Sequence, residues 1–178
     1  MELLDVLDDN GLKTGITKDK DEIYKTGEWF RSVHIWIVND NNELLLQKRS
    51  PYKTTFPNLW AVSVSGHVMA GETSIQAVIR EVKEELDIDI NSNQCKYLFT
   101  IRRQNIFNNC INRVYDDVYI VKLNIDVVNA NIQRTELNEI KYFNLYNLKD
   151  MLENYDPRFV PLDLEKEEIF KYLESNIL

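Results

Sequence analysis

The sequence has few of the residues that mark disulfide-rich, zinc-binding or membrane-spanning proteins. Only two of its 178 residues are cysteines, Cys95 and Cys110, and neither belongs to a C-x-x-C pair or a zinc-ligand spacing. We expect reduced thiols, although one disulfide is chemically open. No apolar run approaches the length of a membrane span, and the acidic start MELLDVLDDN lacks the features of a signal peptide. These absences predict a cytoplasmic protein with no membrane partner.

Positive charge is also scarce. Lys and Arg number 21 against 29 Asp and Glu, which gives a net charge of −8. Such an acidic field disfavours nucleic acid polymers and anionic membranes as partners. A small anionic ligand stays open where cations or local basic residues receive it. The length and the 44% hydrophobic composition fit a globular chain, and we expect a single domain over residues 1–178.

Hydrophobic patterning predicts a mixed α/β fold. A β-hairpin is expected within residues 1–29, where LLDVL and LKTGIT flank the turn DDNG. A core of about residues 30–150 and a C-terminal helical segment at 151–178 follow. The expected strands are 33–38, 43–49, 60–65, 96–102, 114–123 and 140–143, and the expected closing helices are 148–154 and 164–176.

The stretch REVKEELDI, residues 80–88, crowds Glu81, Glu84 and Glu85 together. Thr73 followed by Gln76 is a capping box, which predicts that a helix begins directly after Thr73. Apolar residues then recur at helical spacing, and the three glutamates fall on a different flank. Like charges four apart cost only about 0.2–0.5 kcal/mol per pair, so a solvated helix face is one interpretation. The other is a site for a divalent cation with oxygen ligands.

The spacing around this helix favours the metal site. Gly66 is followed after five residues by Glu72 and after seven more by the sequence R-E-V-K-E-E-L-D-I. This resembles the Nudix box, G-x5-E-x7-R-E-U-x-E-E-x-G-U, where U is a bulky aliphatic residue. The one departure is Asp87, where the family has glycine. That glycine is most simply the residue that ends the helix in a left-handed conformation, so we expect Asp87 to end the helix and not to bind metal.

The resemblance implies an α/β/α sandwich on a mixed sheet and a hydrolase that cleaves diphosphate linkages with Mg²⁺ or Mn²⁺. It implies that Glu81, Glu84 and Glu85 bind the metal, with the carbonyl of Gly66 as a further ligand. It also implies an ion pair of Glu72 with Arg80 that braces the loop against the helix. The catalytic candidates are Glu81, Glu85 and, outside the box, Glu136.

Residues 2–150 also resemble the isopentenyl diphosphate isomerase branch of the superfamily, through segments such as LLLQKRSPYKTTFPNLWAVSVSGH. The isomerase residues are mostly absent. Ser65 replaces the isomerase cysteine, Tyr24 (or its neighbour) and Phe30 stand at its histidine positions, and Tyr115 and Asp117 stand at its two glutamates. The sequence is therefore identified as an isomerase-like Nudix hydrolase. A true isomerase and a catalytically silent ligand-sensing module are the alternatives, and a homodimer is left open.

Residues outside the box supply further candidates. Arg49 and Lys53 match positions that contact diphosphate in the isomerase branch, and cations there suit phosphate oxygens. Asp116, Asp117 and Glu136 are candidates for an extra carboxylate, with Glu136 and Asp117 favoured.

The histidines, the paired arginines and the aromatic residues are interpreted more simply. His67 is expected to stabilise its loop and His34 to be a satisfied buried histidine. Trp36 and Trp60 are assigned to packing. The remaining interpretations are solvated side chains for Arg102 and Arg103, and weak base-stacking candidates in Tyr52 and Phe56.

Overall fold

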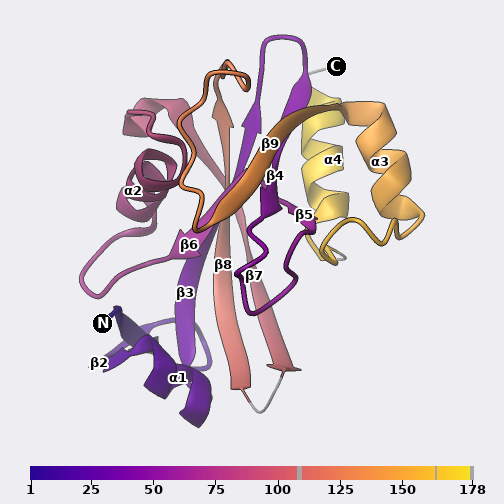
Figure 1. Ribbon diagram of the computed structural model, residues 1–178. Coiled ribbons are helices and arrows are strands. Elements are labelled where there is room, and N and C mark those ends of the chain that lie inside the picture. Colours follow the sequence, from indigo (N-terminus) through magenta and orange to yellow (C-terminus); the bar gives the residue numbers. More distant parts are fainter. Residues whose placement is uncertain (108–109, 163, 177–178) are drawn as a thin grey trace.

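The computed structural model describes residues 1–107, 110–162 and 164–176. They form a mixed sheet with helices on both faces, as predicted (Figure 1). The elements in chain order are β1 (Leu3–Leu7), β2 (Lys13–Asp19), α1 (Lys20–Thr26), β3 (Trp29–Val38), β4 (Glu43–Arg49), β5 (Trp60–Ala61), β6 (Val64–His67), α2 (Ser74–Leu86), the 3-10 turn η1 (Ser92–Gln94), β7 (Cys95–Phe107), β8 (Cys110–Lys122), β9 (Leu137–Asn144), α3 (Leu145–Glu153) and α4 (Lys166–Asn176).

Strand β3 organises the sheet. On one side it pairs in parallel with β8 along its whole length, from Trp29 to Val38. On the other side it changes partner, from β1 at Trp29 to β6 over residues 32–35 and then to β4 at residues 37–38. Strand β4 in turn pairs with β9 in antiparallel fashion. The sheet therefore divides between β6 and β4, next to the loop that leads from Gly66 into α2.

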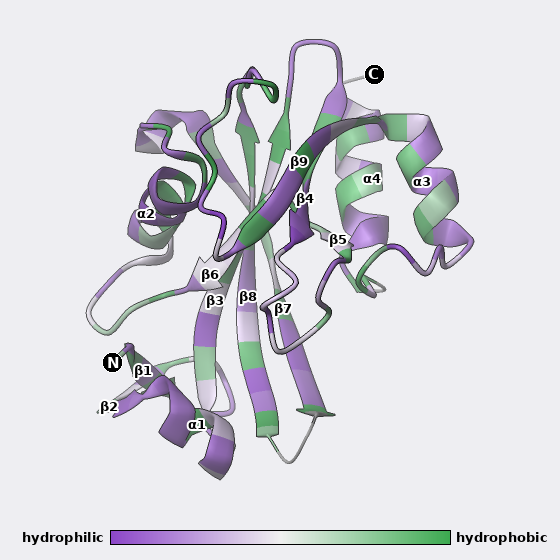
Figure 2. Ribbon diagram, in the orientation of Figure 1, coloured by the Kyte–Doolittle hydropathy of each residue, from purple (hydrophilic) through white to green (hydrophobic). Residues whose placement is uncertain are grey.

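The two faces of the sheet are covered by different helices. Helix α2 packs its buried Val78, Val82 and Leu86 on one face, against residues such as Val33 and Ile35. Helices α3 and α4 cover the opposite face near Trp36 and Ile120. A smaller cluster that includes Ile23 of α1 and Phe30 covers the far end of this second face. Figure 2 shows the apolar residues concentrated in the central strands and on the inner sides of the helices.

Most of the expected elements are present, but several boundaries differ from the expected ones: β3 begins at Trp29, β9 spans Leu137–Asn144, α3 spans Leu145–Glu153 and α4 begins at Lys166. The strand expected at 60–65 is two strands, β5 and β6. The Ser63 hydroxyl between them accepts a hydrogen bond from the Ile37 amide at 2.7 Å and donates to the Leu45 carbonyl. A side chain thus bridges β3 and β4 where they separate, and the strand is interrupted. Strands β7 and β8 are longer than expected. Each has 13 residues, and they pair with each other in antiparallel fashion.

Helix α1 was not expected within the N-terminal hairpin segment. It is only seven residues long and buries one residue, Ile23, so it has no apolar stripe to recognise. Its ends are nevertheless marked in the sequence. The Asp19 side chain caps its first turn, and Gly27 ends it at φ 76°. In the part of the chain that the structure describes, no helix combines the length and the apolar character that a membrane crossing requires.

Candidate metal and diphosphate site

Helix α2 begins and ends where the sequence predicts. The Gln76 side-chain oxygen accepts the Thr73 amide at 2.9 Å, which completes the capping box. Asp87 ends the helix with φ 56° and ψ 33°, in the left-handed region, and its amide donates to the Lys83 carbonyl. The Asp87 carboxylate lies 2.8 Å from Lys83 Nζ and accepts from Asn131 at 3.0 Å. It is therefore engaged in closing the helix.

Gly66 lies against the carboxylate of Glu81. A Cβ at position 66 would be 2.0 Å from the Glu81 carboxyl carbon, which no side chain could tolerate. Only glycine lets this carboxylate rest on the backbone at the end of β6. Glu81 is 9% exposed, and burial raises its pKa despite the opposing charge of Arg80.

Arg80 connects the loop to the helix. Its Nε and Nη2 bind the two oxygens of Glu72, each at 3.0 Å, and Nη2 donates to the His67 carbonyl at 2.8 Å. Its Nη1 lies 2.6 Å from Glu81 and 3.2 Å from Glu84. Burial alone would lower the pKa of Arg80, but these carboxylates raise it. The ion pair of Glu72 with Arg80 is the one expected from the box.

Glu85 is the most deeply buried of the three glutamates. It is 4% exposed, and its Oε2 has no hydrogen-bond partner among the described residues. Burial raises the pKa of this carboxyl well above its usual value, and the charges of Glu81 and Glu136 raise it further. Lys53 and Arg49 oppose the rise. A buried carboxylate without a partner is costly, and a divalent cation would satisfy it.

The loop after β4 and the loop before β9 form the side of the candidate site that faces Glu85. Lys53 forms an ion pair with Glu136, and the Ser50 amide donates to the Glu136 carbonyl at 2.9 Å. Arg49 donates through Nη2 to the Thr55 carbonyl at 2.9 Å, and burial lowers its pKa. The charges of Arg49, Lys53 and Glu136 all act on the pKa of Glu85, and the Gln133 amide donates to the Glu85 carbonyl at 2.9 Å, so the loop before β9 adjoins this part of α2.

Asp116 and Asp117 are consecutive residues of β8, so their side chains point to opposite faces of the sheet. Asp117 accepts from Arg31 at 2.7 Å, from Thr100 at 2.5 Å and from Ser74. Both of its oxygens are thus occupied at the start of α2. Among the described residues it makes no hydrogen bond or ion pair with the glutamates of α2. The expectation of an extra carboxylate from β8 therefore has no contact to support it.

The three glutamates do not enclose an ion by themselves as they lie. Within residues 1–107, 110–162 and 164–176, no group of three or more His, Cys, Asp or Glu side chains is arranged to hold a metal. The exposed Glu84 turns toward Arg80 instead. Two observations still fit a divalent cation at this place: the unpartnered oxygen of Glu85 and the Glu81 carboxylate seated on Gly66.

Two contacts made by segments near the ends of the chain were not revealed by the sequence, one at His67 beside Gly66 and one at His34 and Trp36 on the face of the sheet opposite α2. The His67 Nδ1 lies 2.6 Å from the Glu2 carboxylate, and its Nε2 lies 3.0 Å from the Tyr24 hydroxyl. The fully buried Glu165 accepts from Trp36 Nε1 at 2.6 Å and lies 2.7 Å from His34 Nδ1. Glu2 and Glu165 belong to no motif, so only the fold identifies their contacts.

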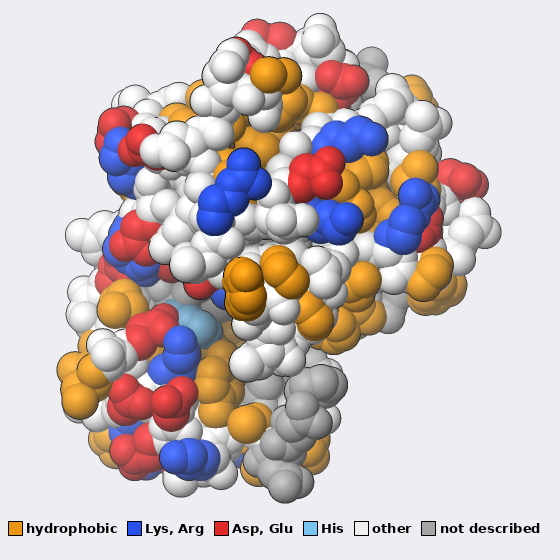
Figure 3. Space-filling model, viewed as in Figure 1, with side chains coloured by type: hydrophobic (Ala, Val, Ile, Leu, Met, Phe, Trp, Pro, Cys, Tyr) orange, Lys and Arg blue, Asp and Glu red, His pale blue; other side chains and the backbone are white. Residues whose placement is uncertain are grey.

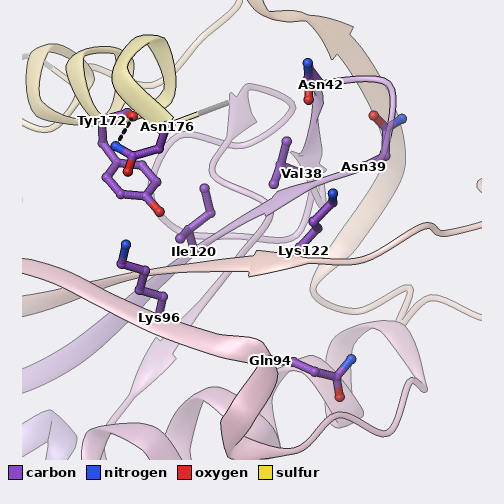
Figure 4. A pocket seen from close by; sticks show the side chains of 9 residues that line it. All are labelled: Val38, Asn39, Asn42, Gln94, Lys96, Ile120, Lys122, Tyr172 and Asn176. Carbon is purple, nitrogen blue, oxygen red and sulfur yellow. Dashed lines mark hydrogen bonds between the residues drawn. The ribbon is translucent and has the colours of Figure 1, made fainter. Parts of the chain in front are cut away.

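A cavity of about 350 Å³ lies elsewhere, beside α4 at the end of β3 (Figure 4). Lys96 and Lys122 line it with Asn39 and Tyr172. Lys96 Nζ sits 4.7 Å from the Tyr172 ring centroid, and Lys122 lies 3.1 Å from Asp40. None of the site residues predicted from the sequence lines this cavity, so its size alone carries no functional weight.

The protein is an α/β/α sandwich. Helix α2 carries the three glutamates and follows the loop after Gly66, where the sheet divides between β6 and β4. The NUDIX domain model matches residues 28–163. The chain belongs to the Nudix hydrolase family. The fold class and the enzyme class predicted from the sequence are therefore confirmed.

Several known proteins resemble the chain over most of its length. Nudix hydrolase 3 of Arabidopsis thaliana is 34% identical over 93% of this chain, which spans only 22% of that protein. An uncharacterized Nudix hydrolase of Clostridium acetobutylicum is 31% identical over 99% of this chain and 87% of its own. The isopentenyl-diphosphate Delta-isomerase 2 of Photorhabdus laumondii is 29% identical over 76% of this chain and 73% of its own.

A solved structure shares the fold. DR0079 from Deinococcus radiodurans superposes with a TM-score of 0.72 at 20% identity, covering 94% of this chain and 98% of its own. At that identity the likeness speaks for the fold alone.

Proposed function

We propose that the protein hydrolyses a diphosphate linkage in a nucleoside diphosphate derivative or a nucleoside triphosphate, with Mg²⁺ or Mn²⁺. The observation that carries this proposal is Glu85, a buried carboxylate with an unpartnered oxygen, beside Glu81 on its glycine cradle. Glu81, Glu84, Glu85 and the Gly66 carbonyl would hold the cation. Such a cation neutralises phosphate oxygens and acidifies a water molecule.

The protein's own residues then position charge around the diphosphate. Arg49 and Lys53 bind phosphate oxygens, and the ion pair of Lys53 with Glu136 is exchanged for this contact. Once Lys53 has moved, the carboxylate of Glu136 is free to accept a proton from the attacking water, with Glu81 as the other candidate base. Glu84, now 3.2 Å from Arg80 Nη1, would help to hold the cation, and the bidentate contact of Arg80 with Glu72 holds the loop in place.

The isomerase alternative is not favoured by the contacts of this chain. Protonating an alkene requires a positioned acid such as a thiol, and Ser65 offers a much weaker one. The ligand-sensing alternative does not explain why Glu81, Glu84 and Glu85 are all kept. A cytoplasmic location and a homodimer stay predictions.

The test is a substrate panel with Mg²⁺ and Mn²⁺, scored both for released phosphate or nucleotide and for interconversion of the two prenyl diphosphates. We expect metal-dependent hydrolysis by the wild type and a loss of at least about 100-fold in Glu85→Gln, since the variant loses a metal ligand. No metal-dependent release from any nucleotide would contradict the proposal. Prenyl interconversion without phosphate release would establish the isomerase instead.

A further inference from the structure

Gln47 of β4 is a buried amide side chain whose oxygen is left without a partner. It is 2% exposed, and its Oε1 has no hydrogen-bond partner among the described residues. Covering an amide oxygen in this way is unfavourable, because the oxygen gives up its contacts with water and gains none in return. Within residues 1–107, 110–162 and 164–176 only four side-chain nitrogen or oxygen atoms are in this state, and Glu85 Oε2 is another of them.

The side chain of Gln47 points to the face of the sheet that α2 covers. Side chains alternate along a strand, so Gln47 shares a face with Leu45 and Arg49. Leu45 belongs to the apolar cluster beneath α2. Lys48 points to the other face, where its Nζ lies 6.0 Å from the centre of the Trp60 ring. The amide of Gln47 is therefore directed at α2 and not at α3 or α4.

The neighbours of Gln47 on this face adjoin the part of α2 that carries Glu85. Val82, one turn before Glu85, packs in the same apolar cluster as Leu45. Arg49, two residues beyond Gln47, acts through its charge against the raised pKa of Glu85. Gln47 thus stands between two side chains, Leu45 and Arg49, that both face this part of the helix. The two unpartnered oxygens belong to facing elements of one buried region.

Neither oxygen is open to bulk solvent, because the side chains of Gln47 and Glu85 are 2% and 4% exposed. In Figure 1 the loop from β4 to β5 and the segment that leads into β9 pass in front of the strands. Figure 3 shows the same front as a surface that carries several basic side chains. The Gln133 amide, in the segment before β9, donates to the Glu85 carbonyl at 2.9 Å. A partner for the two oxygens therefore has to be bound inside the site.

The two oxygens cannot satisfy each other. A carboxylate oxygen and an amide oxygen are both acceptors, so each needs a donor or a cation. A divalent cation satisfies the carboxylate directly. Mg²⁺ also keeps several of its water molecules when carboxylates bind it, and such a water has hydrogens to donate.

We propose that Gln47 is a positioning residue of the metal site, whose Oε1 accepts a hydrogen bond from a water molecule on the cation held by Glu85. This rests on the proposed function only for the presence of the cation. The neutral amide takes no proton and is not the base. Its contribution is to orient one water molecule and, through that water, to help hold the cation in place.

Gln47→Met tests this with two measurements, neither of which is turnover. Methionine has a similar length but lacks the amide oxygen. Without metal, the variant should unfold at the same urea concentration as the wild type or a higher one, because an unsatisfied buried oxygen is removed. It should bind Mn²⁺ about 3- to 10-fold more weakly, measured by the electron paramagnetic resonance of the free ion, because one hydrogen bond to the bound water is lost. A purely structural role predicts the reverse: a less stable metal-free protein with unchanged Mn²⁺ affinity.

Two further variants separate the amide oxygen from packing. Leu45→Met is the matched control, because it introduces the same side chain on the same face of β4 and removes no polar atom. It should bind Mn²⁺ as the wild type does. Gln47→Glu keeps an acceptor and adds a negative charge. It should bind Mn²⁺ at least as tightly as the wild type, while its metal-free form is less stable because a further carboxylate is buried near Glu85.

Wild-type Mn²⁺ affinity in Gln47→Met, or a marked loss of stability of its metal-free form, overturns the proposal. Weaker Mn²⁺ binding by Gln47→Glu than by the wild type also overturns it. These outcomes differ from failure of the metal site itself, in which Glu85→Gln binds Mn²⁺ as the wild type does. They differ as well from failure of the hydrolase proposal, since the predicted Mn²⁺ affinities without turnover of any substrate would keep the role of Gln47 and refute the hydrolase.

Discussion

At the scale of single residues, two buried groups define the site. Glu81 rests on a glycine that has no Cβ to obstruct it, and Glu85 has an oxygen that no described side chain satisfies. Both pKa values are raised by burial, so both carboxylates are costly to keep charged without a cation. We infer that the cost of burying these two carboxylates is offset when they bind a divalent cation.

Gly66→Ala tests the cradle. The new methyl group would displace the Glu81 carboxylate, so we expect kcat to fall by at least about 100-fold, consistent with loss of a positioned metal ligand. Gly71→Ala in the same loop is the comparison, since nothing lies within 4 Å of its Cβ but its φ is 80°. It should cost about 1–2 kcal/mol of unfolding free energy and leave kcat near the wild-type value. Equal kcat values for the two variants would contradict the cradle.

Glu2→Gln tests the contact from the N-terminal strand to His67. The hydrogen bond from His67, together with the ion pair to Lys20, lowers the pKa of Glu2 from 4.5 to about 2. Because the folded value lies below the unfolded one, the stabilisation is present above pH 4.5 and is lost as the pH falls toward about 2. The variant should therefore be less stable by about 1–3 kcal/mol at pH 7, with a smaller difference at pH 3. Urea unfolding at both pH values measures this, and a constant difference would contradict a role of these contacts of Glu2 in stability.

At the scale of elements, local signals in the sequence predicted α2 and β4 well, and contacts between distant segments account for what was missed. The capping box and the apolar stripe of α2 are encoded within a few residues, and β4 runs over residues 43–49 as expected. The break at Ser63 depends on how β3 and β4 separate, which no local pattern records. Arg103 was interpreted as solvated because its partners Asp116 and His34 are distant in the sequence. They become neighbours only when β7, β8 and β3 pair in the sheet.

Asp87 tests the end of α2. Asp87→Gly removes the strain of the left-handed conformation together with the contacts to Lys83 and Asn131. These effects oppose each other, so the net change should stay within about 1 kcal/mol and turnover should be nearly unchanged. Asp87→Ala keeps the strain and loses the contacts, so it should be less stable than Asp87→Gly by about 1–2 kcal/mol. Loss of metal affinity in either variant would show that Asp87 is a ligand.

At the scale of the whole molecule, the split in the sheet brings the separate parts together. Strand β3 exchanges β4 for β6, and the loops that carry Lys53 and Glu136 meet α2 beside that division. The candidate metal ligands and the candidate phosphate-binding residues are thus brought together by one topological feature.

The central claim is that Glu85 belongs to a divalent metal site. Titration of the protein with Mn²⁺, followed by the electron paramagnetic resonance signal of the free ion, tests it without any choice of substrate. The wild type should bind Mn²⁺, and Glu85→Gln should bind it at least about tenfold more weakly while remaining folded, because a charged ligand is lost. Equal Mn²⁺ affinity in the wild type and in Glu85→Gln would contradict the account.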